Sequence, residues 1–506
     1  MACGGESSGG TSGSTGGNGV DLADVELDRD AELTTTLSVL SRWDPHRSVQ
    51  SHDLDVLATV YDRLVHLEPD GTFVPGLATE WAFSDDGLTL TLNLREGVEF
   101  HDGSAFDAEV VKANLERAKT VEGSTAVGSL ASIDTVEVVD PLTVALHLSR
   151  PDAGLVGILS DRPGMMISPE GLTADDLDAV PAGSGMYEVT DYRPNDRIVL
   201  ERFDGYWDPD AAGVRRLTML TMQDEQARLN ALQTGELDIT TVSPATIDAA
   251  DALDGFTVHP QSGLTFRFLQ LNRARSEFGD VRVRQAMNFA IDRQAIADGL
   301  FFGYAVPTVQ PFPEGYWAHS PEAEDAYPHD PDEARDLLAE AGLPDGFEFE
   351  LIIPSGAAEV TTLAEAVQEQ LAEVGITMKL RPVEGAQLAE IFYARAEGDA
   401  LMSEWGGRHD PSTTVGLRYT SDGFSNPGRH TTDELMELYD ESLATSDQAE
   451  REPILQQISD EVVDQVLDIP LVFQEVGWVT RDDVVGFEPN MLGRVEFRGV
   501  GVPVAG

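Results

Sequence analysis

The sequence predicts an α/β fold with more than one lobe, on three observations. Its 506 residues amount to about three domains at roughly 150 residues each, so the chain can bury sizeable cores. Two segments in the first third alternate apolar and polar residues with a period of two, as half-buried antiparallel strands do. Later segments have the patterns of a strand, a helix and a strand in turn, which is typical of parallel pairing.

The first third is expected to be rich in strands. One hairpin leads from 81–83 through Asp85-Asp86-Gly87 into 88–94, where leucines alternate with polar residues. A second leads from 133–139 through Asp140-Pro141 into 142–148, with His147 on the solvated face. Before them, residues 56–67 carry apolar side chains at helical spacing, so we expect one helix there.

The middle and later segments are expected to mix helices and parallel strands. Residues 217–222 indicate a strand, 224–233 a helix and 237–240 another strand. A further helix is expected to end at Gly375, before a strand at 376–380. Three aspartates stand where an N-cap residue would begin a helix: Asp280, Asp292 and Asp330.

Composition excludes several classes of function. The chain has 33 Lys and Arg against 90 Asp and Glu, a net charge of −57. Phosphate backbones and anionic lipid surfaces should therefore repel it, so nucleic acid is not an expected partner. Its 41% of hydrophobic residues indicates a globular chain. A single cysteine excludes a disulfide framework and a cysteine-based zinc site, and no apolar run is long enough to span a bilayer.

That cysteine, Cys3, lies at the start of the chain, before a Gly/Ser/Thr-rich tract that reaches Gly19. We expect residues 1–19 to form a flexible tether. The start resembles a mature bacterial lipoprotein, in which a leader has been removed and the cysteine carries lipid. We therefore expect Cys3 to anchor the protein to the outer face of a membrane. The alternative is a free thiol in a disordered tail.

The sequence has few features of an enzyme. It has no nucleophile elbow, no zinc-protease motif and no phosphate-binding loop. Gly183-Ser184-Gly185 lacks the third glycine of a dinucleotide fingerprint. Adjacent acidic pairs are expected by chance among 90 carboxylates, and the histidines do not have the spacing of metal ligands. We therefore expect no catalytic residues, no cofactor and no metal.

One stretch resembles a known family closely. It runs through Pro75-Gly76-Leu77-Ala78-Thr79-Glu80-Trp81, then Ser84-Asp85-Asp86-Gly87-Leu88-Thr89, to Leu94-Arg95-Glu96-Gly97-Val98-Glu99-Phe100-His101-Asp102-Gly103. It resembles the signature of the extracellular solute-binding proteins that serve oligopeptide, dipeptide and nickel ABC importers (family 5). Shorter matches at 181–187, 232–238 and 281–293 follow in the same order. Together the matches run from about residue 33 to 475.

The resemblance implies a two-lobed fold like that of periplasmic binding proteins, with a hinge and an extra subdomain in lobe I. Lobe I would comprise 20–44, 182–268 and 478–506, the inserted subdomain 45–181, and lobe II 269–477. A ligand would enter the interlobe cleft, the lobes would close, and the closed form would dock on an ABC permease. The protein would then be an extracytoplasmic monomer and not an enzyme. A secreted hydrolase or a ligand receptor on the same frame is the alternative.

Candidate ligand-binding residues also come from the resemblance. Peptide-binding members are expected to carry an Asp three residues after a Trp in lobe II, facing the ligand's ammonium group. Here Trp405 is followed by Arg408, His409 and Asp410. An Arg suits a carboxylate or phosphate, so we expect a short or modified peptide or a small anionic or polyhydroxylated solute.

Two alternatives to ligand contact stay open in this loop. Arg408 and Asp410 could pair with each other and only shape the loop, and Trp405 could pack beneath the loop instead of stacking on a ligand. Three residues after Asp44-Pro45 are weaker candidates, because family members line the cleft in that region: Ser48, Val49 and Gln50.

Overall fold

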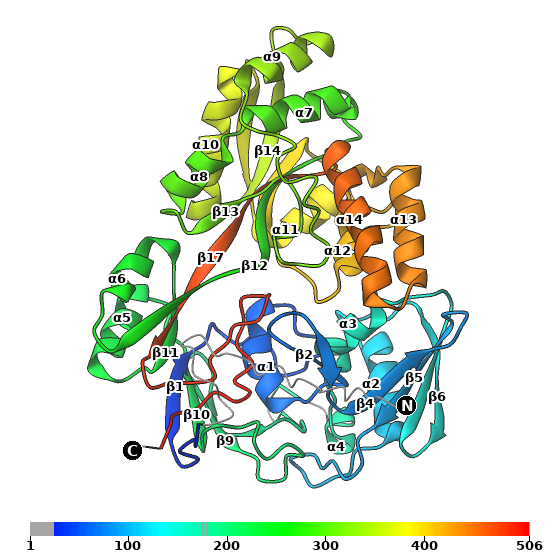
Figure 1. The fold of residues 1–506 in the computed structure, drawn as a ribbon, viewed down its shortest axis with the longest axis vertical. Helices are drawn as coiled ribbons and strands as arrows, with labels where there is room; N and C mark the ends of the chain where they lie inside the picture. Colours follow the sequence, from blue (N-terminus) through cyan, green and yellow to red (C-terminus); the bar gives the residue numbers. More distant parts are fainter. Residues whose placement is uncertain (1–24, 175–176, 179–180, 505–506) are drawn as a thin grey trace, which may run out of the picture.

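The computed structural model describes residues 25–174, 177–178 and 181–504. Cys3 and the expected tether at 1–19 lie outside them. Figure 1 shows a broad lower body and a tapering upper body, joined by the long strands β12 (Phe256–Leu271) and β17 (Ile469–Arg481). The predicted two-lobed α/β fold is confirmed.

One sheet of the lower body begins with the first strand of the described chain. Its strand order is β1-β10-β9-β8, with β1 parallel to β10 and the other neighbours antiparallel. The strands are β1 (Glu32–Thr36), β8 (Tyr187–Arg193), β9 (Arg197–Arg202) and β10 (Arg216–Leu220). Leu33, Leu200 and Leu217 are buried in the core beneath this sheet, together with Trp43 of the segment that follows β1.

The two predicted hairpins form another sheet of the lower body, in the order β4-β5-β7-β6. The strands are β4 (Ala78–Phe83), β5 (Thr89–Leu94), β6 (Ile133–Asp140) and β7 (Thr143–Leu148). Leu90 and Leu92 are buried as their alternation predicts. The ring of His147 is partly exposed and pairs with Glu137 at 2.7 Å. Helix α2 (Ala108–Thr120) packs on this sheet.

The upper body is built on the far ends of β12 and β17. The sheet has the order β11-β17-β12-β16-β14-β15, with β13 on β17. Its other strands are β11 (Ile239–Val242), β13 (Ala305–Pro307), β14 (Glu348–Pro354), β15 (Thr377–Val383) and β16 (Ala400–Trp405). Helices α7 (Val281–Ala290), α8 (Arg293–Leu300), α9 (Pro331–Glu340) and α10 (Ala358–Glu373) surround it (Figure 1). Asp280, Asp292 and Asp330 cap helices as predicted.

The helix predicted at 56–67 is wrong in its second half. Helix α1 (Leu54–Val60) ends at Tyr61, which is extended, and residues 65–67 form β2 (Val65–Leu67). This strand pairs with β3 (Phe73–Pro75), and the Leu64 N–H donates to the Gly164 carbonyl. These partners lie outside the segment, so its apolar spacing alone does not reveal them.

The predicted strand–helix–strand unit forms, but its strands do not pair with each other. Helix α5 (Glu225–Thr234) connects β10 to β11, while β1 is the parallel partner of β10. The Asp238 N–H, at the start of β11, donates to the Thr34 carbonyl of β1 at 2.8 Å. The first strand of the chain therefore lies between the two strands that the local pattern joins.

The connection between the bodies is a pair of antiparallel strands with an interrupted register. β12 and β17 pair along both ends, with a shift between Ser262 and Phe266. Below the shift β11 flanks β17, and above it β16 flanks β12. The predicted lobe boundaries at 268/269 and 477/478 fall within these strands and stay a prediction.

Candidate ligand-binding site

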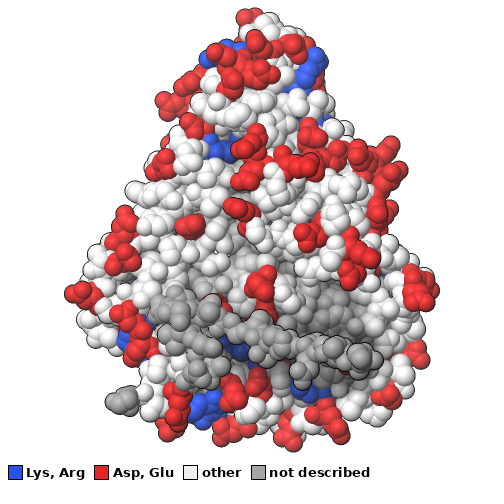
Figure 2. All heavy atoms as spheres, viewed as in Figure 1, with Lys and Arg blue, Asp and Glu red and all other residues white. Residues whose placement is uncertain are grey.

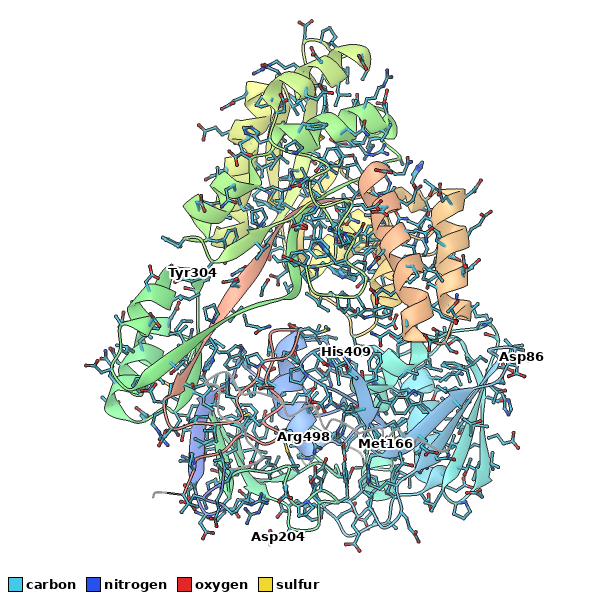
Figure 3. The ribbon with its side chains drawn as sticks, in the orientation of Figure 1. Asp86, Met166, Asp204, Tyr304, His409 and Arg498 are labelled. Carbon is cyan, nitrogen blue, oxygen red and sulfur yellow. The ribbon has the colours of Figure 1, made fainter. Side chains whose placement is uncertain are left out.

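A small cavity lies where the lower and upper bodies meet. It is lined from below by α1 and by the C-terminal segment 490–496, and from above by His409 (Figure 3). Its volume is about 10 Å³, roughly the room that one water needs. The lining residues are Leu54, Asp55, Ala58, Arg63, His409, Asn490, Leu492, Arg494, Val495 and Glu496.

The two bodies touch closely beside this cavity. Helix α3 (Leu155–Leu159) of the lower body lies against the loop after β16, and a Cβ built at Gly157 would lie 2.8 Å from the Asp410 Cβ. The Ala153 N–H donates to the Leu443 carbonyl of α13 (Asp433–Ala444) at 2.9 Å. The two bodies are therefore in direct contact beside this cavity.

The predicted upper-lobe residues begin at the end of β16. Trp405 is partly buried, and its Nε1 donates to the Thr414 hydroxyl at 3.3 Å. The Arg408 guanidinium donates to the Gly406 and Gly407 carbonyls at 2.7 and 3.1 Å and lies 4.8 Å from the centre of the Trp405 ring. Burial lowers the pKa of Arg408, against the opposing effect of the Asp161 carboxylate.

Asp410 is part of a buried ion pair. It accepts hydrogen bonds from Arg451 at 2.8 and 3.0 Å, and from the Ser412 N–H at 2.9 Å as the N-cap of α12 (Pro411–Arg418). Burial raises the pKa of Asp410, but Arg451 outweighs it, and the pKa is lowered. The alternative in which Asp410 pairs with Arg408 is therefore wrong. Asp410 is not among the residues that line the cavity.

His409 reaches across from the upper to the lower body. It is buried, and its Nδ1 lies 2.6 Å from the Ser160 hydroxyl. Burial lowers the pKa of the His409 ring. Beside it, burial opposes ionisation of Asp161, but His409 and neighbouring guanidinium groups bring the pKa of this carboxyl to about 2. His409 is the predicted residue that lines this cavity; Trp405 and Arg408 do not line it.

The weaker candidates lie beside the cavity lining. Ser48 is buried, donates to Asp53 at 2.7 Å and accepts from the Arg162 Nε at 3.2 Å. The Gln50 carbonyl accepts from the same guanidinium, whereas the Val49 side chain is 66% exposed. The structure thus brings Ser48 and Gln50 together around Arg162, whereas the Val49 side chain points to solvent.

Sequence reasoning predicted only His409 among the residues that line the cavity, and it missed four charged ones. Arg63 and Glu496 form a two-pronged ion pair, with one contact at 2.8 Å. Arg494 Nη1 lies 3.6 Å from Asp55 Oδ1. The partners in each pair are more than 400 positions apart in the chain, and no motif marks them. The local sequence gives one hint. Arg494 and Arg498 stand on either side of Glu496, and two arginines so close together are uncommon in this acidic chain.

The junction differs in charge from the outer surface. Figure 2 shows acidic side chains over the visible face of the molecule, with few basic ones. Around the cavity, in contrast, guanidinium groups and carboxylates are gathered together. Four arginines lie among five acids that interact with them, namely Arg63, Arg162, Arg408 and Arg494 with Asp53, Asp55, Asp62, Asp161 and Glu496. The junction thus gathers guanidinium groups that are sparse on the visible outer face, and each of them faces at least one carboxylate.

In the part of the chain that the structure describes, no group of three His, Cys, Asp or Glu side chains could hold a metal ion. No described helix is both long and apolar enough to cross a membrane.

Comparison with known proteins gives a consistent picture. The family model for bacterial extracellular solute-binding proteins, family 5, matches residues 72–426. The glutathione-binding protein GsiB of Salmonella paratyphi A is 33% identical over 350 residues, 68% of each chain. GsiB of Escherichia coli K12 is 27% identical over 463 residues, 88% of this chain and 89% of its own.

Solved structures agree. HbpA2 from Haemophilus parasuis has a TM-score of 0.83 and 25% identity, covering 94% of this chain and 100% of its own. AgaA from A. tumefaciens R10, solved with agropinic acid, has a TM-score of 0.79 and 26% identity over 94% and 99%.

Proteins of this family are the solute-binding components of ABC importers and catalyse no reaction. They act outside the cytoplasm, and nothing in the comparisons supports a hydrolase. The family model covers most of the chain in a single match, and GsiB of Salmonella paratyphi A is 33% identical over 68% of each chain. The chain therefore belongs to family 5 of the bacterial extracellular solute-binding proteins.

Proposed function

We propose that this protein captures a short or modified peptide, or another small anionic solute, at the junction of its lobes and delivers it to an ABC permease. One observation carries the choice of ligand, namely the guanidinium groups gathered at this junction in a protein of net charge −57. A guanidinium offers a planar set of donors that matches a carboxylate, and its attraction is stronger away from bulk water.

The names of the relatives agree with this choice. Glutathione, named for GsiB, carries two carboxylates, and agropinic acid, found with AgaA, is an acid. The peptide STSA, found with DppA of Helicobacter pylori, has a terminal carboxylate. Trp405 and His409 would then contact the ligand beside Arg408, whereas Asp410, Ser48 and Gln50 would hold the surrounding loops.

Ligand entry requires the lobes to open. A cavity of about 10 Å³ is far below the roughly 300–1,000 Å³ typical of small-molecule sites. The interrupted pairing of β12 and β17 between Ser262 and Phe266 is the natural hinge, because those strands join the bodies there. In this proposal the closed protein is a monomer that a lipid on Cys3 and the 1–19 tether hold near the permease.

Calorimetry on the purified full chain tests the proposal. Glutathione, a neutral and an acidic tripeptide, an organic acid and a neutral sugar would be titrated, and each ligand would be recovered and its mass measured. We expect at least one carboxylated ligand to bind and to be recovered intact, with weaker binding in Arg408→Ala. Selective binding of the neutral sugar, or conversion of a ligand, would contradict the proposal.

A further inference from the structure

We propose that the Asp55 and Arg494 side chains bind an amino-acid head group, in which an ammonium and a carboxylate sit on one carbon. This inference rests on the proposed function and names the chemistry of one end of its ligand. It starts from two polar atoms in the cavity region that are buried and lack a hydrogen-bond partner among the described residues, Asp55 Oδ1 and Arg494 Nε.

These two residues come from different parts of the lower body. Asp55 lies in the first turn of α1, and Arg494 lies in the C-terminal segment. Arg494 Nη1 donates to the Ser51 carbonyl and lies 3.6 Å from Asp55 Oδ1, an ion-pair distance that is too long for a hydrogen bond. The two groups are therefore held close together with part of their hydrogen-bonding capacity unused.

The neighbouring Arg63–Glu496 pair in the same wall is an ion pair whose members are hydrogen-bonded to each other. Arg63 and Glu496 meet through two contacts, and Arg63 also donates to the Ser160 carbonyl at 3.1 Å. A buried polar atom without a partner has lost its hydrogen bonds to water and gained none in exchange, so an open pair beside a complete one points to a position where another molecule binds. Burial raises the pKa of Asp55, against the effect of Arg494, and a cationic group would favour its charged form.

The short distance between Asp55 and Arg494 indicates which ligand group would fit them. Asp55 needs a donor, Arg494 needs an acceptor, and the two lie next to each other. The ammonium and carboxylate of one α-carbon are adjacent in the same way. In an ordinary α-linked peptide the ammonium and the terminal carboxylate stand at opposite ends of the chain. They belong to different residues, whose α-carbons are at least about 3.8 Å apart. A γ-linked glutamyl peptide, in contrast, keeps both on one carbon, so the site should favour it.

The closed cavity has room for about one water, and a water could satisfy the same two atoms. Calorimetry of the full chain with four probes separates a water site from a head-group site. The probes are L-γ-glutamylglycine, its N-acetyl derivative, its α-carboxamide and α-linked L-glutamylglycine. We expect the unmodified γ-linked dipeptide to bind at least ten-fold more tightly than each of the other three.

Two isosteric variants assign each group of the probe. In Asp55→Asn, N-acetylation should weaken binding less than three-fold, because the acceptor of the ammonium is already gone. In Arg494→Gln, replacing the α-carboxylate of the probe by its carboxamide should likewise weaken binding less than three-fold, because the guanidinium that would bind this carboxylate is already gone. The exposed pair Asp332 and Arg335 on α9 provides the matched controls Asp332→Asn and Arg335→Gln, which should keep the wild-type ten-fold differences.

The wild-type titrations decide the inference even where a variant does not fold. Equal affinity for the γ-linked and α-linked dipeptides, or undiminished affinity after N-acetylation, would overturn it and leave only a water at the two atoms. Binding of none of the four probes would overturn it as well. The proposed function survives those results if a carboxylated ligand binds in the separate screen, so the two failures are distinguishable.

Discussion

Two ion pairs near the interlobe junction, Asp410–Arg451 and Asp55–Arg494, use their charges in different ways. In the loop after β16 of the upper body, Asp410 accepts two hydrogen bonds from Arg451, at 2.8 and 3.0 Å. In the lower wall, Asp55 and Arg494 stand 3.6 Å apart, each with an atom that has no hydrogen-bond partner among the described residues. The first pair holds a loop in place, and the second is the one that we propose to bind a ligand group.

A charged residue can lie in the expected binding region and still be unavailable to a ligand. The family resemblance directed attention to the segment from Trp405 to Asp410, in which Asp410 is already enclosed by its own protein partners. A charged residue in a binding region becomes a ligand group only if its partners leave it incomplete. The following predictions test that distinction, beginning with the largest expected effect.

Asp410→Asn should be the most damaging to stability. The substitution keeps the shape and an N-cap acceptor but leaves the Arg451 guanidinium buried without its counter-charge. Breaking a buried pair on one side costs about 3–5 kcal/mol, and we expect a loss of that size in the free energy of unfolding by urea. Asp332→Asn, in an exposed pair with Arg335, should cost less than about 1 kcal/mol. Similar losses in the two variants would contradict the structural role of the buried Asp410–Arg451 pair.

Arg408→Ala should affect ligand binding more than stability. Its guanidinium bonds only neighbouring carbonyls in the described structure, at Gly406 and Gly407, so the fold loses little. If it donates to a ligand carboxylate, its removal should weaken binding ten-fold or more, since a charge-assisted hydrogen bond contributes about 1.5–3 kcal/mol. Titration of the same carboxylated ligand into both proteins measures this. Unchanged affinity would show that Arg408 only shapes the loop.

Asp161→Asn should alter the pH dependence of stability. The pKa of Asp161 is about 2 in the folded protein, below its ordinary value near 3.9. The charged form therefore contributes stability that is fully present above about pH 4 and is lost as the pH falls through 2. The difference in unfolding free energy between wild type and variant should be constant from pH 5 to 7 and shrink below 4. A difference that does not change with pH would contradict the charge contacts assigned to Asp161.

Local patterns predicted most of the fold and only part of the site. The hairpin around Asp85-Asp86-Gly87 and the N-cap at Asp330 depend on neighbouring residues, and both formed as expected. Strand β2 was missed because its partner strand and the Gly164 carbonyl lie outside its own segment. Most of the candidate site was missed for the same reason, because the residues that pair there lie far apart in the sequence. Nothing near Asp55 in sequence indicates Arg494, and nothing beside Asp410 indicates Arg451.

Asp55→Asn provides the smallest expected change in stability and the sharpest test of the comparison. Burial disfavours the charged form of Asp55 and raises its pKa, so neutralising this side chain removes a desolvation cost as well as the attraction to Arg494. Since the pair is not within hydrogen-bond distance, these effects should nearly cancel. We expect the free energy of unfolding to change by less than about 1 kcal/mol, a magnitude typical of pairs that contribute little.

The value of Asp55 would then lie in binding and not in folding, the reverse of Asp410. Urea unfolding of Asp55→Asn and Asp410→Asn, measured side by side, makes the comparison direct because both changes replace a carboxylate by an amide of the same shape. A loss in Asp55→Asn as large as that in Asp410→Asn would mean that the lower wall is also a completed structural pair. A stable Asp55→Asn would show that the fold holds this carboxylate without depending on it.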